Sequence, residues 1–133
     1  MENAKLRSAI MRAVKSNDTG PEKIVRSMVH RLGFRFRLHR NDLPGKPDIV
    51  FPRLQKVIFV HGCFWHGHRC ARGNRVPVHN RDYWVKKIER NKQRDRKAIQ
   101  LLHKLEWKCK IVWECSLKKP EQVNSSLAKY LSS

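Results

Sequence analysis

The stretch that decides the fold is residues 56–70, KVIFVHGCFWHGHRC. Its apolar run at residues 57–60 predicts a buried strand, because short continuous apolar runs are typical of strands covered on both faces. Directly after this strand, Cys63, His68 and Cys70 offer metal ligands at close spacing. A tetrahedral zinc site requires four ligands of this kind. The stretch therefore predicts a strand that ends in a zinc-binding loop.

The same loop carries side chains that zinc does not need. His61 and His66 are left over, and histidine is the common acid–base side chain near neutral pH. Phe64 and Trp65 lie between the ligands, where a loop pinned by metal can hold aromatic rings outward. Two interpretations stay open at this point: a structural zinc loop with incidental histidines, or a loop that also carries catalysis.

Composition indicates one basic domain that binds a polyanion. The chain has 133 residues, which suits a single domain with a modest core. It carries 30 Lys+Arg against 11 Asp+Glu, a formal charge of +19. This excess is self-repulsive unless a polyanion is bound, and nucleic acid is the usual one. Without a membrane span or a signal peptide, a cytoplasmic location is expected, where cysteines are thiols or metal ligands rather than disulfides.

Hydrophobic periodicity predicts the element order α-β-β-β-α-β-α, an α/β sandwich with a mixed sheet. Residues 1–18 read as a short helix or an arm that orders on a partner. The pattern after Asn80 allows two helices or one with a bend. In the first helix, Ile24 is expected on the buried face. Strands are predicted at residues 34–38, 47–51, 56–60 and 108–113, and helices at residues 20–32, in the region 81–105, and from residue 120 onward.

The few acids of this basic chain are candidates for a second site. Asp48 begins one predicted strand and His61 ends the next, an arrangement suited to a hard divalent ion such as Mg²⁺. Glu22 and Asp95 are further candidates. The alternatives are that Glu22 favours a helix dipole and that Asp95 pairs with neighbouring arginines.

The fourth zinc ligand is expected to be a remote cysteine. Cys109 alternates with apolar neighbours in a predicted strand, which indicates a core position. Cys115 follows the end of that strand, where a side chain can point at a loop. Cys115 is therefore the predicted ligand.

Three segments resemble a known family. Pro47-Asp48, residues 59–66 (FVHGCFWH) and residues 111–115 (IVWEC) are similar to the very short patch repair endonucleases, and the resemblance runs from about residue 8 to residue 117. It implies a restriction-endonuclease-like fold of the PD-(D/E)xK nuclease superfamily with a structural zinc site. Phe59 stands where the superfamily has its second acid, and His61 stands where it has a lysine.

The resemblance also implies a role for each site residue. Mg²⁺ would be held by Asp48 with the backbone carbonyl of Val60, while His66 would be the general base and His61 an assisting histidine. Glu22 and Asp95 would act through bound water. The structural zinc ligands would be Cys63, His68, Cys70 and Cys115. The DNA-wedging residues would be Phe64, Trp65 and Trp84 from the major groove and Met11 from the minor groove, and the mismatch-reading residues would be Lys87 and Asn91.

The implied activity is strand-specific nicking of double-stranded DNA beside T:G mismatches left by deamination of 5-methylcytosine. Residues 1–18 would then be a DNA-contacting arm and residues 19–133 the endonuclease domain of a monomer, with mismatch-repair accessory proteins as candidate partners. Two alternatives are a restriction-type endonuclease of the same fold and a zinc-containing DNA-binding module without catalysis. The wedging aromatics weigh against the first, and the clustered acid and histidines weigh against the second.

Overall fold

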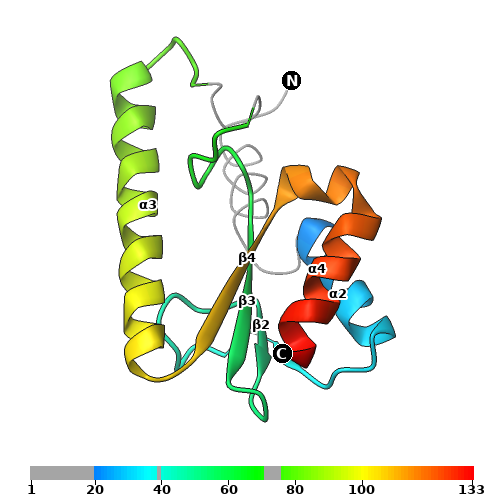
Figure 1. Ribbon diagram of the computed structural model, residues 1–133. Helices are drawn as coiled ribbons and strands as arrows, with labels where there is room; N and C mark the ends of the chain where they lie inside the picture. Colours follow the sequence, from blue (N-terminus) through cyan, green and yellow to red (C-terminus); the bar gives the residue numbers. More distant parts are fainter. Residues whose placement is uncertain (1–19, 39, 71–75) are drawn as a thin grey trace, which may run out of the picture.

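A four-stranded mixed sheet is the centre of the fold (Figure 1). The computed structural model describes residues 20–38, 40–70 and 76–133, so the predicted arm at residues 1–18 lies outside the described residues. The strands are β1 (Arg37–Leu38), β2 (Ile49–Phe51), β3 (Lys56–His61) and β4 (Lys108–Trp113). Their order is β1-β2-β3-β4, with antiparallel pairing up to β3 and a parallel β3–β4 pair. The predicted mixed sheet is confirmed.

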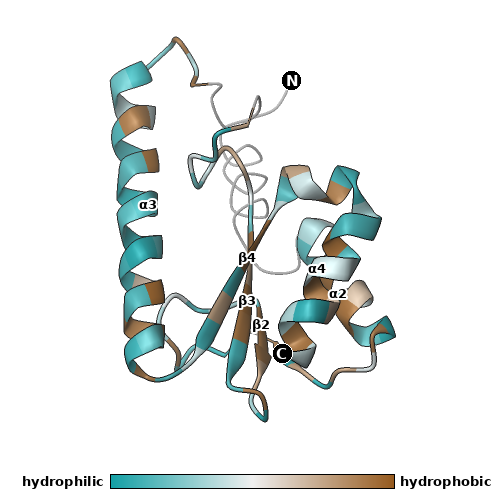
Figure 2. Ribbon diagram, viewed as in Figure 1, coloured by the Kyte–Doolittle hydropathy of each residue, from teal (hydrophilic) through white to brown (hydrophobic). Residues whose placement is uncertain are grey.

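Helices cover both faces of this sheet. Helix α3 (Arg81–Lys104) lies on one face, and α2 (Gly20–Arg31) and α4 (Pro120–Ser132) lie on the other (Figure 1). Every residue of β2 and β3 is buried, as expected for central strands between two helical layers. Hydrophobic residues accordingly gather on the sheet and on the helix sides that face it, while α3 is mostly hydrophilic (Figure 2).

Alternating side chains of the central strands enter two separate cores. Ile58 and Val60 point to the α2–α4 side, and Val57 and Phe59 point to the α3 side. This alternation follows from the two-residue period of a strand. Leu102 anchors α3 in the second core. The first core is completed by Val25, Met28, Val29, Ile49, Phe51, Val112, Val123, Leu127 and Leu131.

The C-terminal helix is tied to the start of the parallel strand pair. The buried Lys56 ammonium donates hydrogen bonds to the carbonyls of Tyr130 at 2.6 Å and Ser133 at 2.7 Å. A cation at the last carbonyls of a helix also complements the helix dipole. The Tyr130 hydroxyl lies 2.9 Å from the carbonyl of Val57 and 2.8 Å from that of Lys108, so it bridges β3 and β4. These contacts hold the two strands whose far ends carry the candidate site.

Several local features differ from the predictions. The strand predicted at residues 34–38 is reduced to β1, because only Arg37 and Leu38 pair with β2, and the strand predicted at residues 47–51 begins at Ile49. Ile24 is 47% exposed, because the apolar residues of α2 that are buried are Val25, Met28 and Val29, and Ile24 lies beside the face that they form. A 3₁₀ helix, η1 (Glu114–Lys118), follows β4 and was not predicted.

The open question about the region after Asn80 is also answered. One continuous helix of 24 residues, α3, spans the polar middle that suggested a break. That middle is polar because it faces the candidate site instead of a core, as the contacts of Asn91 and Asp95 below demonstrate. None of the described helices is long and apolar enough to cross a membrane.

Candidate active site

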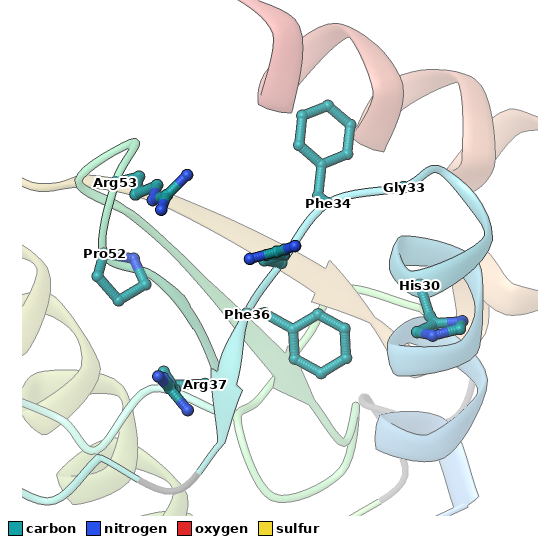
Figure 3. Close-up of a pocket in the computed structure, with 8 residues that line it drawn as sticks. His30, Gly33, Phe34, Phe36, Arg37, Pro52 and Arg53 are labelled. Carbon is teal, nitrogen blue, oxygen red and sulfur yellow. The ribbon is translucent and has the colours of Figure 1, made fainter.

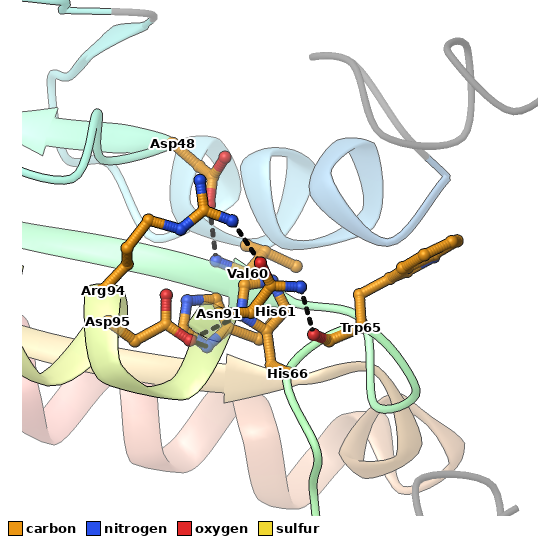
Figure 4. A network of polar contacts seen from close by, with 8 residues as sticks. All are labelled: Asp48, Val60, His61, Trp65, His66, Asn91, Arg94 and Asp95. Carbon is orange, nitrogen blue, oxygen red and sulfur yellow. Dashed lines mark hydrogen bonds and ion pairs between the residues drawn. The ribbon is translucent and has the colours of Figure 1, made fainter. Parts of the chain in front are cut away.

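Asp48 and Glu22 form an acidic pair at the end of the sheet where β3 ends. Asp48 directly precedes β2, and its Oδ2 accepts a hydrogen bond from the backbone N–H of Val60 at 2.6 Å (Figure 4). Glu22 lies in the first turn of α2 and is only 6% exposed. Arg26, one turn further along α2, approaches Glu22 to 4.0 Å.

Burial raises the pKa of Asp48 to about 7. The Val60 N–H opposes this shift, whereas the neighbouring Glu22 carboxylate adds to it. Two carboxylates that repel one another in a buried position are stabilised by a bound cation. Oxygen ligands of this kind are what hard divalent ions prefer. The chemistry of Asp48 and Glu22 therefore fits a divalent metal ion.

Two histidines and an acid lie together beside this pair. The rings of His61 and His66 stack face to face, with centroids 3.8 Å apart and an interplanar angle of 3°. The Nδ1 atom of His66 lies 2.6 Å from Oδ2 of Asp95 on α3 (Figure 4). His61 Nδ1 lies 4.0 Å from the same oxygen and has no hydrogen-bond partner in the described part of the chain. Burial lowers the pKa of His61 to about 4, with a further contribution from His66, so His61 is neutral at neutral pH.

This trio is better suited to proton transfer than to metal binding. The nitrogen and carboxylate atoms of His61, His66 and Asp95 are close enough together to surround an ion. However, an imidazole nitrogen binds a metal in the plane of its ring, and the planes of the two stacked rings are parallel. One ion cannot lie in both planes. The hydrogen bond to Asp95 instead fixes the orientation of the His66 ring, and Nε2 is the ring nitrogen that this bond does not use.

A second cluster joins the loop after β3 to the residue after β4. The side chains of Cys63, His68, Cys70 and Cys115 offer ligand atoms that all lie within 4.8 Å of one another. Cys115 Sγ is 3.4 Å from His68 Nδ1, and the Cys115 backbone N–H donates to Cys63 Sγ at 3.4 Å. Burial raises the pKa of the Cys63 thiol to about 12, so a thiolate there requires a cation. The donor set fits a tetrahedral metal site.

The parallel register explains why Cys115 joins this cluster and Cys109 does not. His61 pairs with Trp113, so the residues that follow them leave the sheet side by side. Cys109 instead packs against the core beneath α3. The expected choice of Cys115 over Cys109 as the fourth member therefore agrees with the arrangement of the chain.

An aromatic cluster forms the outer edge of the site. Phe64 and Trp65 on the loop meet Trp84 on α3, with ring centroids 5.0 to 5.8 Å apart. All three side chains are half-buried. Lys87, one turn along α3 from Tyr83, places its ammonium 5.8 Å from the centre of the Trp65 ring. The cluster presents flat apolar surfaces beside cations, which is a combination suited to stacking with nucleic-acid bases.

Comparisons with known proteins identify the family to which this sequence is similar. The family described as DNA mismatch endonuclease Vsr matches residues 2–72, more than half of the chain. The chain is 52% identical over 111 residues to the type II nicking enzyme V.XorIIP of Xanthomonas oryzae pv. oryzae, covering 84% of this chain and 81% of that protein. It is 43% identical over 117 residues to the DNA mismatch endonuclease Vsr of Escherichia coli, covering 88% and 74%.

The chain belongs to the Vsr family. The resemblance to the very short patch repair endonucleases is confirmed. In this Vsr-family chain, the predicted site residues that the structure describes come from four places. These are the first turn of α2, the sheet end where β2 begins and β3 ends, the loop after β3 together with the start of η1, and α3. Met11 lies outside the described residues.

Two contacts in this Vsr-family site were not anticipated from sequence. Asn91 Nδ2 donates to the backbone carbonyl of Trp65 at 2.8 Å, and the guanidinium of Arg94 donates to Asn91 Oδ1 (Figure 4). The spacing of Asn91 and Arg94 on one helix face was the available signal. Nothing local in the sequence indicates that Trp65 would reach them.

Two hollows on the surface differ in position: one includes residues of this Vsr-family site, and the other lies away from it. One, of about 630 Å³, runs along α3 and is lined by cations together with Tyr83, Asn91 and Gln93. Its cationic residues are Lys86, Lys87, Arg90, Arg94 and Lys97. The other, of about 640 Å³, is lined by residues 33–37, Pro52 and Arg53 with His30 (Figure 3). Since residues 52–53 follow β2 and Asp48 precedes it, the second hollow lies at the opposite end of this strand from the acids.

Proposed function

We propose that this Vsr-family endonuclease nicks one strand of duplex DNA beside a T:G mismatch produced by deamination of 5-methylcytosine. One observation carries the proposal: Trp65 and His66 are neighbours on one loop, and α3 holds both. A ring suited to intercalation is thus joined directly to a histidine suited to proton transfer. An enzyme that cuts one strand beside a distorted base pair needs the residue that binds the distortion close to the residue that transfers the proton.

The acids are proposed to bind Mg²⁺. Asp48 with the backbone carbonyl of Val60 would hold the ion, and Glu22 would take part through water. Support comes from the buried pair of carboxylates and from the raised pKa of Asp48. When bound, Mg²⁺ stabilises the charge that develops on the phosphate and favours ionisation of a nucleophilic water.

His66 is proposed to take the proton of the attacking water. The Asp95 carboxylate accepts from Nδ1–H at 2.6 Å, which leaves the Nε2 lone pair as the basic site. His61 lies against the His66 ring and stays neutral, so it adds no competing positive charge when His66 becomes protonated. His61 is therefore proposed to position and assist His66.

Cys63, His68, Cys70 and Cys115 are proposed to bind a structural Zn²⁺. A tetrahedral ion there joins the loop after β3 to the start of η1, and structural zinc contributes about 10–16 kcal/mol to the folding of small domains. The wedge residues Phe64, Trp65 and Trp84 depend on this loop. The zinc would therefore hold the wedge residues in position for DNA recognition without taking part in the hydrolysis.

The DNA is proposed to lie across the aromatic cluster and the basic hollow of α3. Phe64, Trp65 and Trp84 would enter from the major groove and unstack the mismatched step, and Met11 on the arm at residues 1–18 would enter from the minor groove. Residues 19–133 would be a monomeric restriction-endonuclease-like domain. Mismatch-repair accessory proteins are proposed as further partners, and the cytoplasm is proposed as its location.

A nicking assay tests this function. Duplexes with T:G, T:A or C:G at one position are incubated with the enzyme, with and without Mg²⁺. A single nick next to T:G that requires Mg²⁺ is expected. Equal cleavage of all three duplexes would favour a restriction-type enzyme, and absence of cleavage with intact binding would favour a non-catalytic module. Asp48→Ala and His66→Ala are expected to bind T:G duplex as wild type does, with nicking reduced by roughly 10²–10⁴.

A further inference from the structure

The geometry points to Arg94 as a residue that makes the enzyme specific for T:G, by holding the side-chain amide of Asn91 in one orientation. This inference rests on the proposed function, in which Lys87 and Asn91 read the mismatched bases. An asparagine amide normally offers donors on nitrogen and acceptor capacity on oxygen. In this site the Arg94 guanidinium donates to Asn91 Oδ1, and Asn91 Nδ2 donates to the Trp65 carbonyl.

These two contacts determine which way the amide points. A flipped amide would set its N–H groups against the guanidinium, which has only donors, and its oxygen against the Trp65 carbonyl, which has only acceptors. Both contacts would then be repulsive. The oxygen of Asn91 is therefore held toward Arg94, and we assign the second N–H of Nδ2 as the donor that Asn91 offers to a base in the α3 hollow that both residues line.

The result is a reading surface that presents donors. Lys87, one helical turn before Asn91, lines the same hollow and contributes an ammonium, which has no acceptor. Arg94 takes one lone pair of Asn91 Oδ1 and holds that oxygen toward its guanidinium, so that Asn91 offers its remaining N–H to a base. Lys87 and Asn91 thus offer N–H groups to the major groove.

This surface complements the T:G pair and neither of the two correct pairs that share a base with it. In the major groove, thymine presents O4 and guanine presents O6 and N7, so a T:G pair has acceptors and no amino group. A T:A pair adds the N6 amino group of adenine, and a C:G pair adds the N4 amino group of cytosine. An amino group that meets N–H groups is left without a partner, which costs affinity. With its oxygen held toward Arg94, Asn91 meets either amino group with an N–H.

Arg94→Met tests the inference, with Arg90→Met as the matched control. Arg90 lines the same hollow and its substitution removes the same charge, but Arg90 makes no hydrogen bond to Asn91 among the described residues. Affinity is measured for T:G, T:A and C:G duplexes without added Mg²⁺, followed by nicking with Mg²⁺. Arg94→Met is expected to lower the preference for T:G over T:A and over C:G by roughly tenfold, the factor expected for one hydrogen bond to a base edge. Arg90→Met is expected to weaken all three duplexes alike.

A modified base separates reading from a general loss of structure. A duplex with thymine opposite purine, which lacks the 6-amino group of adenine, should bind wild type more tightly than T:A does. Arg94→Met should treat these two duplexes alike, and its zinc content and melting temperature should match wild type. The inference would be overturned if Arg94→Met kept the wild-type preference for T:G, or if Arg90→Met changed that preference by the same factor. It would also be overturned if wild type bound the purine duplex as weakly as the T:A duplex. A wild type without any T:G preference would instead reject the proposed function.

Discussion

Asp95→Asn tests the mechanism most directly, because it removes a charge and keeps the shape of the side chain. The Asp95 carboxylate accepts from His66 Nδ1 at 2.6 Å, and both side chains are about a quarter exposed, at 26% and 25%. Solvent therefore screens the pair only in part. A hydrogen bond to a charged group contributes about 1.5–3 kcal/mol. Loss of that energy from the state in which His66 holds the proton corresponds to a roughly 10- to 150-fold slower reaction.

A second effect adds to this loss. The asparagine amide can donate N–H to Nδ1 of His66, which would place the ring proton on Nε2 and remove the lone pair that takes the proton of water. The total is bounded by the value of a general base, roughly 10²–10⁴. Asp95→Asn should thus nick T:G duplex at least tenfold more slowly than wild type.

The assay is single-turnover nicking of a T:G duplex at saturating enzyme and Mg²⁺, with affinity measured separately. Asp82→Asn is the control, since Asp82 lies in the first turn of the same helix and is exposed. It should nick at the wild-type rate. If Asp95→Asn binds and nicks within threefold of wild type, Asp95 does not orient His66 and the proposed proton path is wrong.

Four further predictions concern the metal loop and the DNA contacts. Cys115→Ala should lose bound zinc and aggregate, whereas Cys109→Ala should retain zinc; equal metal content in the two variants would mean that the ligand set is misassigned. Gly67→Ala should lower the free energy of unfolding by about 1–3 kcal/mol in denaturant titration. The reason is that Gly67 has φ +63° and an added Cβ would lie 2.7 Å from Ile88 Cγ2. A variant as stable as wild type would contradict the packing described. Trp65→Ala should remove one stacking ring, worth about 1–3 kcal/mol, so its preference for T:G over T:A should shrink in competition binding; an unchanged preference would reject the wedge. Affinity should fall with salt at a slope of roughly −0.9 per phosphate contact, and a flat response would mean that the +19 charge serves another purpose.

Local sequence was sufficient for the elements whose signals lie within one turn or one strand. The strand at Lys56–His61 follows from an apolar run, and the helix from Pro120 follows from its apolar spacing and its proline. Three members of the Cys/His cluster lie within eight residues of one another, so their grouping was also visible in the sequence. The resemblance of residues 59–66 to a nuclease family supplied the roles, which physical pattern alone left open.

Tertiary structure decided the contacts between residues that are distant in sequence. His66 meets Asp95 across 29 residues, Trp65 meets Asn91 across 26, and Cys115 meets His68 across 47. Each pairing depends on how α3 crosses the sheet and on the parallel register of β3 and β4, which only packing of the whole chain sets. Periodicity reports which face of an element is buried, but it carries no information about which distant side chain lies opposite. For this reason the sequence alone determined which cysteines and histidines gather in the loop after β3, and the tertiary structure decided that Asp95 meets His66 and that Asn91, itself bonded to Arg94, meets the backbone of Trp65.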